Sequence, residues 1–292
     1  MRSTLDCIPC LTRQALFAVR LVHGGAHDDQ AAEPLLRRAL AELADMDLAL
    51  PPPVTAARLH ELLQGMTGGA DAFAEAKARF QEFALALLPG LERTVAGADD
   101  PFEAAVRAAV AGNVIDLGVK GDLGEDEARA NMDAAMHHPL SGDVAAFRAA
   151  CEEARNILYL ADNAGEIVFD RLLLERLPRG RTTVCVRGGP IINDATRKEA
   201  DQAGIPDLAR VIDSGVALPG TWLPECGTDL REAFAAADLI IAKGQGNYET
   251  LSDTPEAAGA PVWFLFKVKC AAVAGHSGLP LNHHVVMRGG GA

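Results

Sequence analysis

The chain has 292 residues, of which 49% are hydrophobic, enough to bury a core in one large domain or two smaller ones. The net charge is −13 and no basic stripe is present, which argues against a nucleic-acid-binding protein. No apolar run approaches the roughly 18 residues that span a bilayer, and no signal-peptide core is visible, so we expect a cytoplasmic protein without membrane association.

Apolar residues recur at helical spacing through the first half of the chain, which predicts an N-terminal helical region over residues 1–150. The predicted helices include residues 11–22, 32–43, 72–88 and 101–111. The run over 72–88 should end at Pro89, because proline inside a helix removes a backbone hydrogen bond.

Short apolar runs alternate with helical stretches in residues 151–292, which predicts a second, α/β domain. The predicted strands are 157–161, 182–186, 209–212, 239–242 and 262–266. Strands that alternate with helices imply right-handed crossovers and parallel pairing. We therefore predict an α/β fold with three layers, α/β/α, around a mostly parallel sheet.

Polar residues follow each predicted strand, where ligands bind in open parallel sheets. Asp162 and Asn163 follow the first strand, and Asp194 follows the second. Their oxygen atoms suit Mg²⁺, Mn²⁺ and similar cations. The alternative is helix capping, since Asp and Asn are preferred N-caps. Their occurrence after consecutive strands favours a metal site.

Lys243 and Lys269 lie near the ends of the last two predicted strands and are candidates for binding phosphate. A solvated surface lysine is the ordinary alternative for either one. The chain has no Walker pattern, and no GxGxxG pattern follows the first predicted strand, which argues against a nicotinamide-dependent dehydrogenase.

Cys7 and Cys10 form a lone CxxC pair, whereas the other cysteines are too scattered for a disulfide framework. One such pair supplies half of a four-thiolate zinc site. Cys270 would be a third ligand if the N-terminus folds back, with His276 as a fourth. The alternatives are a redox cluster or two reduced cysteines at the start of a helix.

Further along, Asn113 is either part of a helix C-cap or points into the cleft.

Three segments resemble the signature of the damage-control phosphatase family, long called domain of unknown function 89. They are residues 158–170 (LYLADNAGEIVFD), 190–196 with its Asn-Asp-Ala-Thr, and 243–248 (KGQGNY). The CxxC pair, the Gly-Asn-Val-Ile-Asp run at 112–116 and the Lys-Val-Lys-Cys run at 267–270 resemble the microbial, cysteine-containing branch. The resemblance covers essentially the whole chain. It implies a metal-dependent phosphatase that acts on small phosphometabolites.

The resemblance also implies roles for individual residues. Asp162, Asn163 and Asp194 resemble the family's metal ligands, for manganese, nickel, cobalt or magnesium, and Lys269 resembles the lysine that contacts the substrate phosphate. Asp162 and Lys269 are the predicted catalytic residues. The predicted substrate-binding residues are Asn113, Glu166, Lys243, Gln245, Asn247, Tyr248 and Lys267.

We expect hydrolysis of a phosphomonoester, with a metal-bound water or Asp162 itself as the nucleophile. Relatives that act on sugar phosphates and phosphopantetheine carry Arg-Thr-x-Lys where this chain has Phe-Lys-Val-Lys at 266–269, so the substrate stays open. One alternative is a nucleotide-binding phosphotransferase that uses the same sheet edge. The other is a non-enzymatic metal or redox protein organised by Cys7, Cys10 and Cys270. The sequence does not indicate an oligomeric state.

Overall fold

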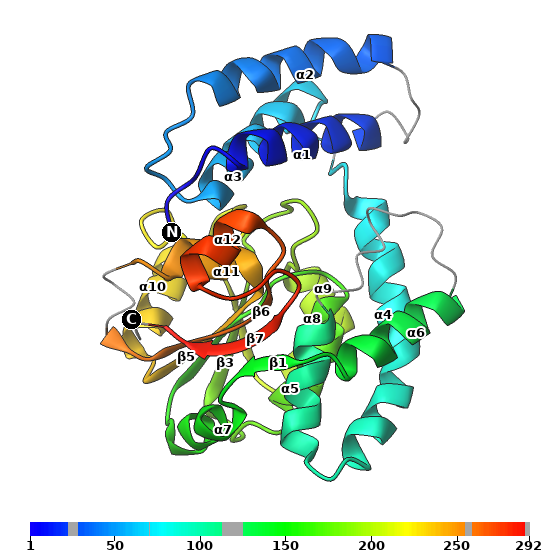
Figure 1. The fold of residues 1–292 in the computed structure, drawn as a ribbon, viewed down its shortest axis with the longest axis vertical. Helices are drawn as coiled ribbons and strands as arrows, with labels where there is room; N and C mark the ends of the chain where they lie inside the picture. The colour runs from blue at the N-terminus through cyan, green and yellow to red at the C-terminus, as the bar shows by residue number, and fades with distance from the viewer. Residues whose placement is uncertain (23–28, 70, 113–124, 255–258, 290–292) are drawn as a thin grey trace.

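The computed structural model describes residues 1–22, 29–69, 71–112, 125–254 and 259–289. Within them lies one seven-stranded sheet with the order β1-β7-β6-β5-β2-β3-β4 (Figure 1). Its strands are β1 (Leu140–Gly142), β2 (Ile157–Leu160), β3 (Thr182–Val186), β4 (Arg210–Asp213), β5 (Leu239–Lys243), β6 (Val262–Lys267) and β7 (His284–Arg288). Strands β2 to β6 are parallel to one another, whereas β7 is antiparallel to β6. The prediction of a mostly parallel sheet is confirmed.

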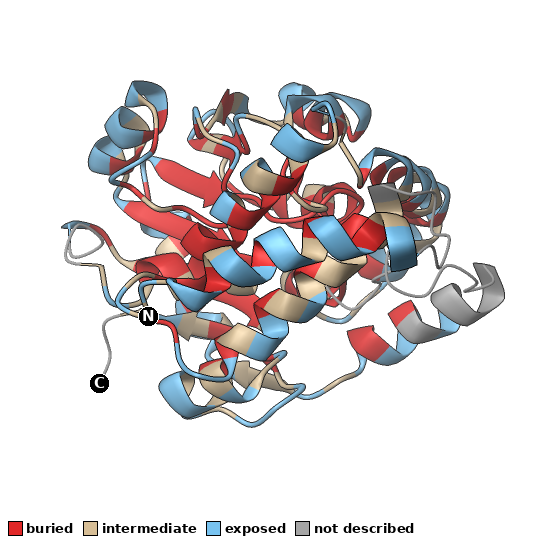
Figure 2. Cartoon of the chain, turned by 90° about the horizontal axis from the view of Figure 1, so that it is seen from above, coloured by how far each residue is buried: buried red, intermediate tan, exposed pale blue. Residues whose placement is uncertain are grey.

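Helices cover both faces of the sheet, so the predicted three-layer architecture is confirmed. One face is covered by α5 (Pro101–Ala111), α7 (Val144–Glu153), α8 (Glu166–Leu174) and α9 (Arg197–Gln202). On this side α4 (Ala74–Ala96) packs on α5 and α8, and α6 (Glu125–Met136) packs on α5. The other packs on α10 (Thr228–Ala236), α11 (Gly244–Leu251) and α12 (Ala271–Ser277). Successive residues of a strand point to opposite faces, as Tyr159 and Leu160 do. Figure 2 shows the buried strands in red between the helices.

The helices α1 (Cys7–Val22), α2 (Asp29–Ala44) and α3 (Pro52–Met66) form a separate layer, which we name the helical cap. They pack on one another through their own apolar cluster, which includes the fully buried Val19 and Ala39. Figure 1 shows the cap over α11 and α12. None of the helices in the described ranges is both long and apolar enough to cross a membrane.

The five predicted strands are all present, and β1 and β7 are additional. β1 has only three residues, which is too short for a periodic pattern to be recognised. The predicted division into residues 1–150 and 151–292 stays a prediction. The apolar side chains of α4 and α5 belong to the same cluster as those of the sheet, whereas the helical cap has a cluster of its own.

Helix α4 continues through Pro89, so the prediction that the helix ends there is wrong. Leu87 and Leu88 before the proline, and Val95 after it, are all buried. Burial of this apolar stripe on both sides of Pro89 offsets the backbone hydrogen bond that the proline removes.

Candidate functional site

A cavity of about 540 Å³ lies between the helical cap and the carboxyl ends of the central strands. One side is formed by α1, α3 and α4, and the other by the segments that follow β2, β3, β5 and β6. The predicted site residues that line it are Cys7, Cys10, Asp162, Asn163, Asp194, Gln245, Lys269 and Cys270. The topology brings distant parts of the sequence together at this edge of the sheet.

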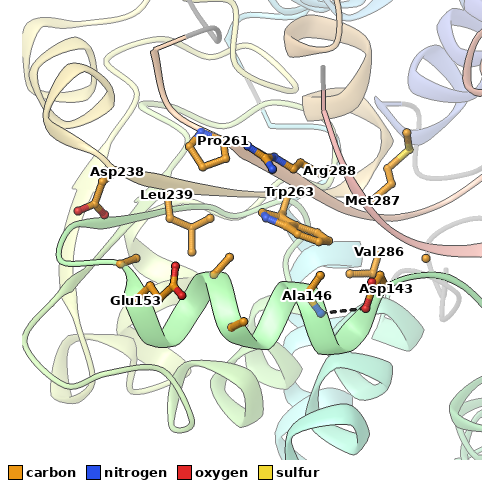
Figure 3. Close-up of a pocket in the computed structure, with 14 residues that line it drawn as sticks. Asp143, Ala146, Glu153, Asp238, Leu239, Pro261, Trp263, Val286, Met287 and Arg288 are labelled. Carbon is orange, nitrogen blue, oxygen red and sulfur yellow. Dashed lines mark hydrogen bonds between the residues drawn. The ribbon is translucent and has the colours of Figure 1, made fainter. Parts of the chain in front are cut away.

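A larger hollow, of about 810 Å³, lies against α7 at the amino-terminal ends of β5 and β6. Figure 3 shows α7 facing Leu239, Trp263 and Val286 across it. Asp143, which also lines it, caps α7 by accepting a hydrogen bond from Ala146 N at 2.8 Å. None of the predicted site residues that the structure describes borders this hollow. The candidate chemistry therefore belongs to the smaller cavity at the carboxyl ends.

Asp162 and Asp194 lie side by side at the floor of the smaller cavity. Ala195 N donates to the backbone oxygen of Asp162 at 2.8 Å, which ties the loops after β2 and β3 together. The guanidinium group of Arg187 lies against both carboxylates. Its Nε donates to Asp194 Oδ2 at 2.6 Å, and its Nη2 is 3.8 Å from Asp162 Oδ1. Both carboxylates therefore lie against the same guanidinium group.

Arg187 is a site residue that the sequence analysis did not single out. It directly follows β3, and its side chain is almost completely buried. Among the residues that the structure describes, its Nη2 atom has no hydrogen-bond partner, although Nε is paired with Asp194. Its sequence position could have indicated it as a site residue, because it is the first residue after a predicted buried strand. The same criterion identified Asp162.

The helix-capping alternative does not describe these aspartates. Helix α8 has Gly165 as its N-cap residue, and glycine has no side chain with which to cap. Helix α9 begins with a capping box in which Thr196 N donates to Glu199 Oε2 at 2.9 Å. Asp162 and Asp194 precede these caps and interact with Arg187 instead.

The carboxyl group of Asp162 is hard to ionise without further positive charge. Burial raises its pKa to about 8, with Glu166 and Asp194 as the next causes. Arg187 and Lys269 act in the opposite direction without cancelling the shift. Burial also raises the pKa of Asp194, although Arg187 opposes this change. A bound divalent cation would supply the missing positive charge.

The donor set at this position fits an oxygen-preferring cation. Asn163 Nδ2 donates to Asp162 Oδ2 at 2.9 Å and to Glu166 Oε2 at 3.2 Å. The amide nitrogen of Asn163 is therefore in use, and its amide oxygen, Oδ1, is the atom that would serve as a metal ligand. Within the described ranges, no group of three or more His, Cys, Asp or Glu side chains is arranged to hold a metal ion. A cation here would therefore combine two carboxylates with this amide oxygen, and with water or substrate oxygens.

Glu166 and Lys243 lie beneath the cavity rather than along it, which corrects the predicted substrate contacts. Lys243 Nζ donates to Ala109 O and to Glu166 Oε1, each at 2.8 Å, and also to Asp170 Oδ1. Both Lys243 and Glu166 are completely buried. With its three N–H donors used, Lys243 does not bind a substrate phosphate, and instead it fixes Glu166 under Asn163.

Asn247, Tyr248 and Lys267, three further predicted substrate contacts, are also absent from the cavity lining. Asn247 Nδ2 donates to the backbone oxygen of Lys243 at 2.7 Å. The ring of Tyr248 stacks on Phe266, with centroids 4.7 Å apart. Lys267 ends β6 and pairs with β7, outside the cavity lining. These residues hold α11 and β6 in place.

Gln245 and Lys269 remain at the cavity. Lys269 is exposed, and its backbone N–H donates to Gln245 Oε1 at 3.0 Å. Gln245 Nε2 in turn donates to Glu249 Oε1 at 3.0 Å. Lys269 is also close enough to Asp162 to lower the pKa of that carboxyl group. This is the arrangement expected of a lysine that neutralises an anion beside Asp162.

Lys77 is a second site residue that the sequence analysis overlooked. It lines the cavity from α4, is only 5% exposed, and lies 2.6 Å from Asp71 Oδ2. The sequence could have indicated this residue, because Lys77 lies four residues after Phe73 and three before Phe80, within the apolar stripe of α4. A charged residue inside such a stripe needs a partner or a function.

Gly244 allows α11 to begin directly against Asp162. Its φ is +75°, a conformation that disfavours side chains, and a Cβ atom there would overlap the Asp162 carboxylate. The positive end of the α11 dipole therefore lies at the floor of the cavity, where it favours negative charge.

The three predicted cysteines border the cavity as free thiols. Burial raises the pKa of both Cys10 and Cys270, so these thiols are protonated at neutral pH. Gln245 Nε2 lies 3.6 Å from Cys270 Sγ. No group of three or more His, Cys, Asp or Glu side chains that could hold a metal ion is found among the described residues, and the second metal or redox cluster at these cysteines stays a prediction. Asn113, also predicted to bind substrate, lies outside the described residues.

Comparison with known proteins gives matches over nearly the whole chain. A family model described as the damage-control phosphatase ARMT1-like domain matches residues 3–285. A protein of Archaeoglobus fulgidus named damage-control phosphatase is 34% identical over 285 residues, covering 96% of each chain. One from Pyrococcus horikoshii, also so named, is 32% identical and covers 99% of this chain and 98% of its own. The crystal structure of a DUF89 family protein from Pyrococcus horikoshii aligns with a TM-score of 0.89, at 31% identity, over 99% of both chains.

Proposed function

Because the chain belongs to the damage-control phosphatase family, we propose that it is a metal-dependent phosphatase that hydrolyses small phosphomonoesters, including damaged or side-product metabolites. The observation that carries this proposal is the pair of aspartates, Asp162 and Asp194, that share Arg187 at the floor of the cavity. Water and the phosphomonoester are consumed, and an alcohol and inorganic phosphate are released.

The cation would be held by Asp162, Asn163 and Asp194, and when bound it would polarise the phosphoryl oxygens. Lys269, which lines the same cavity, would neutralise negative charge on the transferred group. The amino end of α11, which begins at Gly244 against Asp162, adds partial positive charge. Arg187 keeps the two aspartates in place.

Gln245 and Glu249 form the side wall next to Lys269. Gln245 accepts from the Lys269 backbone, so it fixes the segment that carries this lysine. Lys243 would act through Glu166 and Asn163 rather than through the substrate, because it donates to Glu166, which in turn accepts from Asn163. These contacts support a division of the predicted residues into some that would meet the substrate and others that would hold them in position.

The proposal is tested by phosphate release from a panel of phosphomonoesters with Mg²⁺, Mn²⁺, Co²⁺ or Ni²⁺. We expect activity that is lost with a chelator and falls at least a hundredfold in Asp162→Asn and Asp194→Asn. Asp201→Asn is the control, because Asp201 is exposed on α9, outside the cavity. Hydrolysis that survives both the chelator and the two substitutions would overturn the proposal. Transfer of the phosphoryl group to an added alcohol, without release to water, would instead favour a phosphotransferase.

A further inference from the structure

The cavity has two chemically different sides, and the side that faces the candidate metal position is mostly apolar. Its floor carries Asp162, Asp194 and Lys269. The opposite wall comes from the helical cap, α4 and the turn after β3. Its apolar members include Leu11, Phe17, Pro53, Phe73, Phe80 and Ile192. A phosphate group alone fills only a small part of a cavity of about 540 Å³.

The aromatic rings on this wall are positioned by the helical cap. Phe17 and Phe73 have ring centroids 6.0 Å apart and are tilted by 52°. Phe73 is buried, whereas Phe17 is half-buried and lines the cavity. A half-buried ring at a cavity wall is available to contact an apolar part of a ligand.

Ile192 completes the wall in an unusual backbone conformation. Its φ is +42°, a region that β-branched residues avoid. Its side chain packs on the apolar cluster of the helical cap and also lines the cavity. It lies two residues before Asp194, so the strained turn presents an apolar side chain and a carboxylate to the same space.

The polar side chains that the cap and α4 contribute to the cavity differ in their surroundings. Lys77 is paired with Asp71 at 2.6 Å. Asp6 and Arg13 are exposed, so water already solvates their charges. Gln14 of α1 and Asn193 of the turn after β3 are half-buried and line the cavity, so they are the side chains of this wall that could pair with hydroxyl groups of a sugar or polyol. The other hydroxyl groups of such a ligand would lie unpaired against the apolar residues of the wall, which is unfavourable.

We propose that the substrate is an amphipathic phosphomonoester, whose phosphate lies at Asp162 and Lys269 and whose hydrocarbon or aromatic arm lies against Phe17, Phe73 and Ile192. This inference rests on the proposed phosphatase function. A polyol phosphate of similar size would place its hydroxyl groups against the same apolar wall and would bind more weakly.

The test compares esters that share a phosphate and differ in the arm: methyl, glyceryl, phenyl and hexyl phosphate. We expect kcat/KM at least tenfold higher for the phenyl and hexyl esters than for the glyceryl ester. In Phe17→Ala we expect the preference for hexyl over methyl phosphate to fall about tenfold. Phe83→Ala is the matched control, since Phe83 is also half-buried but lies outside the cavity.

Direct binding separates this inference from the proposed function. Calorimetry with hexylphosphonate and methylphosphonate, which are not hydrolysed as esters, should give tighter binding of the hexyl compound by about tenfold, weakened by Phe17→Ala. Equal affinity for the two phosphonates overturns the inference and leaves the phosphatase function standing. No hydrolysis of any ester with any of the metals overturns the phosphatase function itself.

Discussion

The Nε atom of Arg187 lies 2.6 Å from Oδ2 of Asp194, and neither side chain is more than 5% exposed. Removing one partner of a buried ion pair leaves an uncompensated charge in the interior. Arg187→Met should therefore lower the free energy of unfolding by about 3–5 kcal/mol. Denaturant titration measures the change.

The control for this substitution is Arg197→Met. Arg197 lies 3.5 Å from Asp213, and both side chains are about half exposed. A pair of this kind contributes about 0–1 kcal/mol, so the control should be nearly neutral. Equal losses of stability in the two variants would show that the buried arrangement around Arg187 has no special importance.

Lys243 should behave as a structural residue and not as a phosphate ligand. Lys243→Met leaves the buried carboxylates of Glu166 and Asp170 without their partner, so we expect a loss of about 3–5 kcal/mol in the free energy of unfolding. The double variant Lys243→Met with Asp170→Asn should recover part of this loss. A large rise in KM with unchanged stability would instead mean that Lys243 contacts the substrate.

Gly244 should tolerate no side chain, because a Cβ atom there overlaps the Asp162 carboxylate. We expect Gly244→Ala to lose at least a hundredfold in kcat/KM. Gly180→Ala is the control: Gly180 has a similar φ of +73°, but no described atom would lie within 4 Å of a Cβ atom added there. The control should cost about 1–2 kcal/mol of stability and keep full activity. Comparable activity in the two variants would argue against the close approach of α11 to Asp162.

His284 should make the protein less stable in mild acid. Burial, followed by His138 and Lys267, lowers its pKa from 6.5 to about 4. As the pH falls from about 6.5 to about 4, the unfolded chain binds a proton at this position and the folded chain does not. Stability should therefore fall over this window, by about 1–3 kcal/mol.

Replacing His284 with asparagine should remove this part of the pH dependence. The charged or titratable groups around it are His138, Lys267, Arg107 and His283. His137→Asn is the control, because its side chain is 78% exposed. Unfolding curves at pH 4.5 and pH 7 give the change in the free energy of unfolding between these two pH values. If this change were the same in His284→Asn as in the unmodified protein, the assignment to His284 would be contradicted.

The positions of Asp162 and Asp194 could be predicted because the carboxyl ends of parallel strands meet at one edge of the sheet. The same rule does not say which way a side chain at a strand end points. Lys243 is the last residue of β5 and shares the face of Ile241, which packs towards α5 and α8. The sequence predicts that Lys243 and Ala242 point to opposite faces of the sheet, because side chains alternate along a strand. It does not predict which of the two faces borders the cavity.

Helix α11 gives a second example of this limit. Gln245 and Glu249 are four residues apart and both border the cavity. Tyr248 and Leu251 lie on the opposite side and pack against the sheet. The motif resemblance predicts that residues 245–248 all lie at the substrate. In a helix, however, these successive residues point in different directions, so only some of them face the cavity. Lys77 and the apolar wall were not predictable, because they depend on how α4 and the helical cap fold over the strand ends.

Asp162, Asn163 and Asp194 together should hold one divalent cation. A calorimetric titration of the metal-free protein with Mn²⁺ measures the number of bound cations directly. We predict one Mn²⁺ per chain for the unmodified protein and for Asp201→Asn, and none for Asp194→Asn with its fold intact. Full Mn²⁺ binding by Asp194→Asn would contradict the claim.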